Sequence, residues 1–517
     1  MQTSKIKPSP ADSFIPGNLF LLVPDTDFHD FIEETHDLLR FAPQILTKIE
    51  NDLNAYALKK KSVRAADKLF FENKTKPLKY LQDEEESLST KIVNLSTGRP
   101  RMSAELVFSF LMIRGFLGGS LISKTSKCFL RESRTLHAYL EIRNVKFPGI
   151  TTILENVNQV SEATLNFIFD QQIQRVLCEQ LDDFSKLTID STAVKANSCW
   201  PTDANMITQL LMRTDRLSQT LHLFGLEDFK NRLESKWLTK MDNLVFAINL
   251  AAGKAKSKGK LKKKYRRLLK LGEKTRYALT QQLAAFEEMT DLQTFCPSKR
   301  TRLKWVIDQM KSDLSDAGLV ITYAGERVFK EKNRPSKEKK LSLSDGSAAY
   351  IQKGGRTAVI GYKPQLVRSE NGFVTSVIVP EGNAADSTQL VPALTESMER
   401  TCVIAALVST DDGYSSKAGR DALLDLGVKN VSISGAKGKR LTDEETWESE
   451  TYKTARNDRS AVESLMFTIK DGFGFGELGR RGIKAVRAEM MEKVLAYNTC
   501  RSILLKKRRR DALQKVA

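Results

Sequence analysis

The sequence contains little cysteine and histidine, the residues that bind soft metals and form disulfides. Its 517 residues include six cysteines and four histidines, with no Cys-x-x-Cys pair and no histidine at a metal-ligand spacing from a cysteine. We therefore expect neither a zinc site nor a disulfide framework, and any metal must be held by oxygen ligands. These residues are Cys128, Cys178, Cys199, Cys296, Cys402, Cys500, His29, His36, His137 and His222.

Long apolar runs are also missing. No stretch approaches the roughly 20 residues that a membrane span requires, and residues 403–408, among the longest apolar runs, fit a buried strand instead. The first residues lead into Pro8 and Pro10 without the apolar block of a secretory signal. We therefore expect a protein without a membrane partner, located in the cytoplasm.

Charge of one sign predominates. The formal net charge is +19 and the sequence pI is about 9.5, while 41% of the residues are hydrophobic and 28% charged. This balance is typical of a soluble globular protein, and the length predicts two to four folded units. An excess of positive charge this large indicates an anionic partner, most commonly nucleic acid.

Helical periodicity dominates the first third of the chain. Apolar residues repeat at helical spacing over 153–160 and again over 165–177, where Ser161 is a suitable N-cap. An earlier helix is predicted from Ser103 to the Gly118-Gly119 pair. The pattern predicts an all-α domain; its helical pairs fit a DNA-reading unit, but packing alone explains the same pattern and is the favoured interpretation.

The pattern changes at residues 186–192, a short β-favouring run, and returns to helix from about Pro201 to about Pro335. This second helical stretch contains the acid-free block 254–267, with cations that include Lys254 and Lys256. A run of charge is often only a solvated surface, whereas its density and single sign favour contacts with phosphates.

Strand signals then cluster for the first time. Residues 357–363 and 373–379 are β-rich and are separated by a polar turn, 368–372, containing Asn371-Gly372, so we expect them to pair as an antiparallel hairpin. The predicted elements that follow are a helix at 385–400, a strand at 403–408, a helix at 416–426, a strand at 428–433, and helices at 460–470 and 483–504, ending in the basic cluster 506–510. This order predicts an α/β fold with a mixed sheet.

Three acids stand where such a fold can bring them together. Asp190 and Asp411 each come at the end of a predicted strand, and ligands of open α/β sheets collect at such strand ends. On the predicted helix 460–470, Glu463 lies between Arg459 and Lys470 on one face beside an apolar face. The helix can therefore pack on the sheet and hold Glu463 over its margin.

Three carboxylates without histidine or cysteine are suited to Mg²⁺ or Mn²⁺. Two such ions about 3.5–4 Å apart can activate the attacking oxygen and stabilise the leaving oxygen in a displacement at phosphorus. Ordinary surface charge is a strong alternative for each acid taken singly, since the chain has 63 Asp and Glu and most of them must be surface charge.

Four short motifs follow one another in the chain. They are Asp190-Ser-Thr-Ala-Val-Lys195-Ala-Asn197 with Pro201-Thr-Asp203, then Pro380-Glu-Gly-Asn383-Ala-Ala-Asp386, then Asp411-Asp412-Gly413-Tyr414-Ser-Ser416, and finally Arg459-x-x-x-Glu463 with Lys470. In these motifs the region from about 186 to 504 resembles DDE transposases of bacterial insertion sequences, and the helical N-terminal part resembles them more loosely.

This resemblance implies an RNase H-like catalytic core, with the first acid on the first strand, the second just after the fourth and the third on a late helix. Matched residue by residue, these acids are Asp190, Asp411 and Glu463, with Asp412 as the neighbouring alternative to Asp411. The family often has a tyrosine where this chain has Arg456, so no role of that tyrosine is transferred.

The implied reaction uses two Mg²⁺ or Mn²⁺ ions held by the three acids. Water attacks the phosphodiester at a transposon end, and the freed 3′-hydroxyl then attacks target DNA. The cations expected to contact double-stranded DNA are Arg459, Lys470, Arg456, Lys195, Lys262, Lys263, Lys264, Arg266 and Arg267. Simple surface charge is the alternative for each of them, and for Trp200 half-buried packing is the alternative to stacking on an extruded base.

The predicted organisation has four parts. They are a helical N-terminal domain (1–180) for DNA binding or dimerisation, an RNase H-like core (181–200 and 340–480), a helical basic insertion (201–339), and a C-terminal helix with a basic tail (481–517). The leading hypothesis is a homodimeric DNA transposase associated with the bacterial nucleoid. The alternatives are a catalytically inactive DNA-binding remnant and a metal-dependent nuclease that cleaves DNA without joining it.

Overall fold

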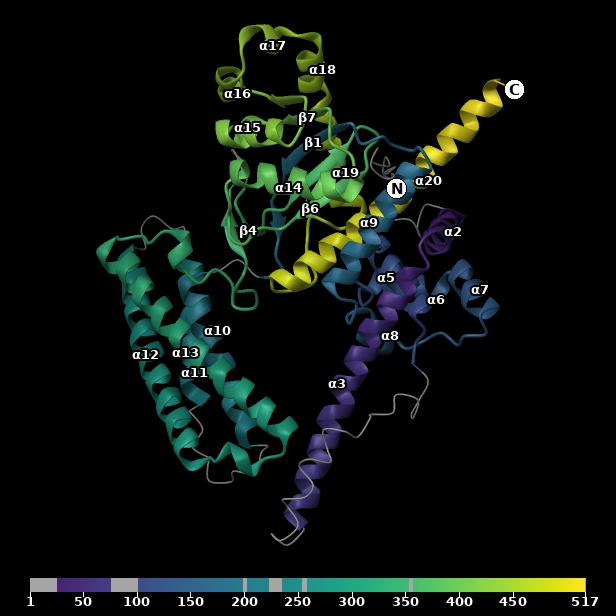
Figure 1. The fold of residues 1–517 in the computed structure, drawn as a ribbon. Coiled ribbons are helices and arrows are strands. Elements are labelled where there is room, and N and C mark those ends of the chain that lie inside the picture. The colour runs from purple at the N-terminus through teal and green to yellow at the C-terminus, as the bar shows by residue number, and fades with distance from the viewer. Residues whose placement is uncertain are drawn as a thin grey trace, which may run out of the picture. The chain divides into compact units, whose positions relative to one another are not determined.

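The structure is a computed structural model that describes residues 26–75, 101–198, 202–222, 235–252, 258–352 and 357–516. The chain divides into two compact units, one formed by residues 1–54, 99–197 and 347–517 and the other by residues 55–98 and 198–346. The first unit contains the two sheets and most of the helices, and the regular secondary structure of the second unit is helical where it is described (Figure 1).

The first unit contains a five-stranded mixed sheet in the order β6-β5-β1-β7-β8. β1 pairs parallel with β7, and β7 with β8, whereas β1-β5 and β5-β6 are antiparallel. A second sheet has the order β2-β4-β3. The strands are β1 (Lys186–Ser191), β2 (Val194–Lys195), β3 (Ala349–Ile351), β4 (Val359–Tyr362), β5 (Gln365–Ser369), β6 (Val374–Ile378), β7 (Leu407–Thr410) and β8 (Asn430–Ile433). The predicted α/β class and mixed sheet are confirmed.

The rest of the regular structure in the first unit is helical. The helices are α2 (Thr26–Phe41), the first part of α3 (Gln44–Thr75), α5 (Ala104–Phe116), α6 (Lys124–Glu132), α7 (Arg134–Ile142), α8 (Ile150–Val157), α9 (Glu162–Cys178), α14 (Asp386–Thr401), α15 (Lys417–Asp425), α16 (Ala436–Leu441), α17 (Glu444–Glu448), α18 (Glu450–Asp458), α19 (Ser460–Gly472) and α20 (Ile483–Val516). α14 and α15 cover one sheet face, where Leu390 and Leu423 join a core with Ile189 and Val408.

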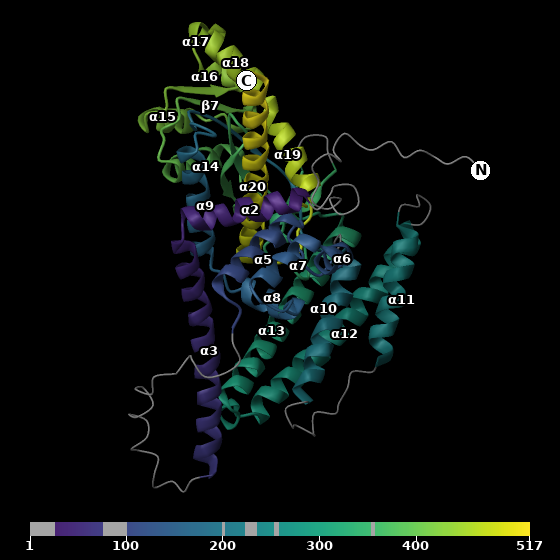
Figure 2. The ribbon, with the colours of Figure 1, turned by 90° about the vertical axis from the view of Figure 1, so that its right-hand side faces the viewer.

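The N-cap predicted at Ser161 is present, and Ser103 caps the helix predicted to start there. The Ser103 hydroxyl accepts a hydrogen bond from the Leu106 amide at 3.3 Å, and the Ser161 hydroxyl accepts one from the Thr164 amide at 3.2 Å. α5 is buried along almost its whole length, as expected for a helix that is apolar on all sides. It packs with α9 against α20, beside which both lie in the two views (Figures 1 and 2).

The predicted hairpin of 357–363 with 373–379 is wrong. The first run is β4, which belongs to the smaller sheet, and the partner of β6 is β5, whose residues Arg368 and Ser369 had been assigned to the turn. Two local features separate β4 from β5. Pro364 lacks an N–H group for a continuous ladder, and a Cβ at Gly361 would lie 1.8 Å from the Val194 carbonyl oxygen, so only glycine allows β4 to approach β2 this closely.

The predicted strand at 403–408 is displaced. β7 begins only at Leu407 and extends to Thr410, because the amides of Ala406 and Leu407 both donate to the Ser185 carbonyl and hold the preceding residues outside the ladder. α20 also runs beyond the predicted end at 504, so the basic cluster 506–510 is helical.

The second unit is a helical bundle around its own apolar core. Its helices are α10 (Asp203–His222), α11 (Ser235–Ala251), α12 (Lys258–Met289) and α13 (Pro297–Lys330), together with the last part of α3. The buried Asp313 of α13 accepts hydrogen bonds from Arg213 of α10, with Nε to Oδ2 at 2.7 Å. The residues predicted as an insertion, 201–339, fall within this unit.

Candidate active site

Two of the three predicted acids stand side by side at the carboxyl ends of parallel strands. In the pairing of β1 with β7, Ile189 lies opposite Thr410, and the next residues are Asp190 and Asp411. Asp411 keeps an extended backbone, with φ −85° and ψ 175°, so the strand direction continues through it. Neighbouring strands lie about 4.8 Å apart and residues in register project to the same face, so the two carboxylates can share a cation.

Asp411 and Asp412 have different partners. The Asp411 carboxylate accepts a hydrogen bond from the Gly413 amide at 3.0 Å and so caps the short 3₁₀ turn Asp412–Tyr414. Asp412 Oδ1 accepts from the amides of Lys437 and Gly438, at 2.9 and 3.1 Å, at the start of α16. Asp412 therefore anchors a helix, while Asp411 is the acid in register with Asp190.

Tyr414 lies buried next to these acids. Burial, together with the negative charges of Asp386, Asp190 and Asp411, raises the pKa of Tyr414 far above its ordinary value. Its hydroxyl donates a hydrogen bond to Gln365 Oε1. The phenol therefore stays protonated and acts as a hydrogen-bond donor beneath the strand ends.

The third predicted acid, Glu463, lies on α19. Its side chain is 65% exposed and forms an ion pair with Arg459, 3.6 Å away. Further along α19, Lys470 Nζ donates to the Ala193 carbonyl oxygen at 3.0 Å, which fixes the helix beside the segment that follows β1. Within the described ranges, no three Asp, Glu, His or Cys side chains stand close enough to hold a metal ion, so Glu463 is not joined to the pair Asp190 and Asp411.

The remaining cations predicted to contact DNA are found in several places. Lys195, on β2, forms an ion pair with Glu477 at 3.0 Å, and both side chains are exposed. The Arg456 guanidinium lies 4.1 Å from the ring centre of Trp447, so it packs against the aromatic ring. Lys254, Lys256 and Trp200 lie outside the described residues.

On α12 the predicted cations differ in exposure. The ammonium of Lys264 donates to the Ala247 carbonyl at 2.7 Å, and Lys262 lies 3.7 Å from Glu331. Lys263, Arg266 and Arg267 are exposed, and the Arg266 guanidinium lies 5.5 Å from the Phe329 ring centre.

Sequence reasoning assigned no role to three residues that adjoin the acids. The Asp386 carboxylate forms an ion pair with Lys363, at 2.9 Å, and accepts a hydrogen bond from Gln365 Nε2 at 3.0 Å. Asp386 ends the motif 380–386 and lies at the start of a predicted helix, where a carboxylate interacts favourably with the helix N-terminus. This position alone does not indicate that Asp386 contacts Lys363 and Gln365.

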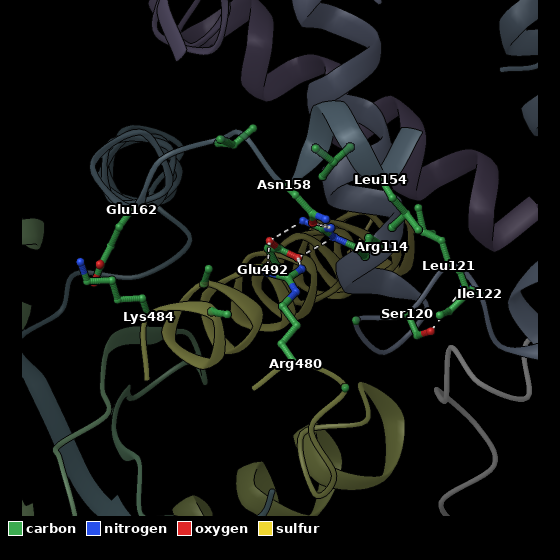
Figure 3. A pocket seen from close by; sticks show the side chains of 16 residues that line it. Arg114, Ser120, Leu121, Ile122, Leu154, Asn158, Glu162, Arg480, Lys484 and Glu492 are labelled. Carbon is green, nitrogen blue, oxygen red and sulfur yellow. Dashed lines mark hydrogen bonds and ion pairs between the residues drawn. The ribbon is translucent and has the colours of Figure 1, made fainter. Parts of the chain in front are cut away.

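A cavity of about 620 Å³ lies elsewhere in the same unit, between α5, α8 and α20. Figure 3 shows the ion cluster on its wall, where Glu492 accepts from Arg114 and Arg480. None of the three predicted acids lines it. This cluster joins α5 to α20 and takes no part in the arrangement of the acids.

The observed parts define an α/β protein with two carboxylates in register at the end of a mixed sheet. Residues 328–499 match the family model of the transposase DDE domain. The resemblance to DDE transposases of insertion sequences is thereby confirmed over this region of the chain. Asp411 and Glu463 lie inside the matched region, whereas Asp190 precedes it.

No match was found among curated proteins or among solved structures. No helix in the described part of the chain combines the length and hydrophobicity needed to span a membrane.

Proposed function

We propose that this protein is a DNA transposase that cleaves DNA at transposon ends and transfers the freed strand into target DNA. The observation that carries the proposal is that Asp190 and Asp411 directly follow Ile189 and Thr410, the last paired residues of two adjacent parallel strands, in a chain whose residues 328–499 match the transposase DDE domain. Paired carboxylates at strand ends are suited to phosphodiester chemistry when cations are bound.

We assign the catalytic core to the RNase H-like fold. Asp190 lies on the first strand of the five-stranded sheet, and Asp411 follows β7, the fourth strand of that sheet in chain order. Glu463 lies on the late helix α19. This order of strands and acids supports the assignment.

The donor set fits Mg²⁺ or Mn²⁺, because Asp190, Asp411 and Glu463 offer only hard carboxylate oxygens. Two bound cations would supply activation of the attacking oxygen and stabilisation of the leaving oxygen. The helix α19 is anchored to the segment that follows β1, and we propose that Glu463 completes the set when metal and DNA are present.

The reaction has two displacements at phosphorus. Water first opens the phosphodiester at a transposon end and releases a 3′-hydroxyl, which then attacks a phosphodiester of the target and forms the new junction. Arg459 and Lys470 carry positive charge close to Glu463 in the chain and would neutralise phosphate oxygens. Lys195, Arg456 and the exposed cations of α12 would add contacts to double-stranded DNA.

A homodimer is part of this proposal, since two transposon ends must be held together and each needs a set of acids. The N-terminal helices are proposed to contribute to DNA binding or dimerisation. The proposed substrate is DNA of the bacterial chromosome and its insertions, so we propose that the protein acts in the cytoplasm.

The test is cleavage of a labelled linear duplex carrying the element's own terminal repeats, with Mg²⁺ or Mn²⁺. Wild type is compared with Glu463→Gln at matched folding and DNA affinity. We expect cleavage at the repeat boundary by wild type and a decrease above about 100-fold in the variant, more than outer-shell partners cause. Equal cleavage by both proteins rejects Glu463, and DNA binding without cleavage by either favours the inactive remnant.

A further inference from the structure

Three elements meet at the Asp386 carboxylate next to the predicted acids. Lys363 follows β4, Gln365 begins β5, and Asp386 begins α14. Lys363 Nζ, nearly buried, lies 2.9 Å from Asp386 Oδ1 and also donates to the Ala384 carbonyl oxygen at 3.2 Å. Gln365 Nε2 donates to the same Asp386 oxygen at 3.0 Å. The Asp386 charge is thus compensated and fixed in one orientation.

The Gln365 amide links the orientation of the Asp386 carboxylate to that of the Tyr414 hydroxyl. An amide side chain has one donor end and one acceptor end, and its Nε2 already faces Asp386. Its Oε1 therefore faces the other way and accepts the hydrogen bond of the Tyr414 hydroxyl. Gln365 and Tyr414 are fully buried, so water does not compete for these bonds.

Tyr414 closes the turn that begins at Asp411. A Cβ placed on Gly413, between these two residues, would lie 3.1 Å from Asp411 Oδ1 and 3.4 Å from Asp386 Oδ2. The second oxygen of Asp386 therefore faces the same glycine as the Asp411 carboxylate. Asp386 thus lies against the turn that Tyr414 ends.

We propose that Asp386, Gln365 and Tyr414, here called the Asp386 relay, are positioning residues that hold the Asp411 carboxylate beside Asp190 and so set the affinity of the site for divalent cations. The proposal rests on the proposed function, since it assigns the relay to that same site. Outer-shell partners of this kind typically change metal affinity or activity by about 10–100-fold.

Tyr414→Phe tests the relay with little change in volume. Mn²⁺ binding to the full chain is measured by the EPR signal of free Mn²⁺, without DNA and without turnover. We expect the Mn²⁺ dissociation constant to rise about tenfold or more. Tyr452→Phe is the matched control: this tyrosine is equally buried and its hydroxyl donates to the Val431 carbonyl at 2.8 Å, away from the acids. It should lose stability but bind Mn²⁺ as wild type does.

A charge swap supplies the rescue. Gln365→Glu places a second carboxylate against Asp386 and should weaken Mn²⁺ binding strongly. Adding Asp386→Asn restores one donor amide facing one carboxylate, with the polarity reversed, and should recover most of the binding. A purely structural role predicts that the double variant binds Mn²⁺ more weakly than Gln365→Glu alone.

The outcomes separate the relay from the function. If wild type binds Mn²⁺ and Tyr414→Phe binds it equally well, the relay is overturned and the proposed function stands. If the swap fails to recover binding in a folded protein, the directional relay is also overturned. If wild type binds no Mn²⁺, the metal site of the proposed function fails and the relay fails with it.

Discussion

The two adjacent aspartates after β7 have surroundings that separate their roles. Asp412 Oδ1 accepts amide hydrogen bonds from the start of α16, an acceptor role that asparagine retains. Asp411 stands in register with Asp190, where charge is required to attract a cation.

We therefore predict that Asp411→Asn abolishes metal-dependent DNA cleavage without lowering the melting temperature, while Asp412→Asn keeps most of the activity and costs at most about 1 kcal/mol of stability. Cleavage assays and thermal unfolding of both variants check this. Abolished cleavage in Asp412→Asn alone would reverse the assignment of the second acid.

Glu492 of α20 is a buried carboxylate held between two arginines. It is 1% exposed, and its oxygens accept from Arg114 at 2.7 Å and from Arg480 at 2.9 Å. Burial alone would raise the pKa of Glu492, but the charges of Arg114 and Arg480 outweigh it and hold the pKa below its ordinary value. A depressed folded-state pKa contributes stability above the unfolded value, about 4.3, which is lost as the pH falls through the folded value.

Glu492→Gln should therefore lower the free energy of unfolding by about 3–5 kcal/mol at pH 7, because it leaves the buried Arg114 and the partly buried Arg480 without their charge partner. The difference from wild type should shrink below about pH 4.3. Urea unfolding at pH 7 and at acidic pH measures it, with the exposed Glu338→Gln as control. A difference that stays constant with pH would contradict the assigned ion pair.

At the level of elements, the residues within a segment were enough to predict where its helix or strand begins or ends. Ser103 and Ser161 start helices as expected, and Asp190 lies next to the last residue of β1. The pairing of strands was not predictable, because Gly361 and Pro364 decide between two sheets through contacts with a distant segment. The Asp386 relay could not be predicted from the sequence for the same reason, because its residues lie in three elements that only the tertiary fold brings together.

Two basic helical segments that look alike in the sequence differ in their charge partners. On α20, Lys506 is paired with Glu34 and Glu179, each at 2.8 Å, and Lys507 with Asp30 at 2.7 Å. On α12, the cations Lys263, Arg266 and Arg267 are exposed. The sequence cannot distinguish them, because the acids that pair with Lys506 and Lys507 come from α2 and from the end of α9.

We predict that the triple change Lys263→Gln, Arg266→Gln and Arg267→Gln weakens DNA binding. The slope of log affinity against log salt should fall by up to about 0.9 for each phosphate that the variant no longer neutralises. The matched control is Lys506→Gln with Lys507→Gln, which should lower stability and leave the salt slope unchanged. Binding titrations at several salt concentrations measure both. Equal slopes for wild type and the α12 variant would remove α12 from the DNA interface.

At the level of the whole molecule, the sheet is built from distant parts of the chain. β1 and β5 are neighbours in the sheet, yet residues 198–346 of the second unit lie between them in sequence. The change from strand to helix pattern near Pro201 indicates such an insertion. The pattern does not indicate that residues 55–98 belong to the same unit, since this depends on contacts such as that of Asp67 with the Ser298 amide, at 2.9 Å.

The proposed dimer leads to the last prediction. If two subunits join two transposon ends, each with its own acids, one inactive subunit should block the joint insertion of both ends. In mixtures of wild type with Glu463→Gln at constant total protein, joint insertion should fall more steeply than the wild-type fraction, while single-end cleavage falls in proportion to it. Mixtures with the exposed Glu338→Gln should show neither decline. Gel quantification of both products decides the matter: parallel decline would show that each subunit acts alone, and cleavage without any joined product would identify a nuclease.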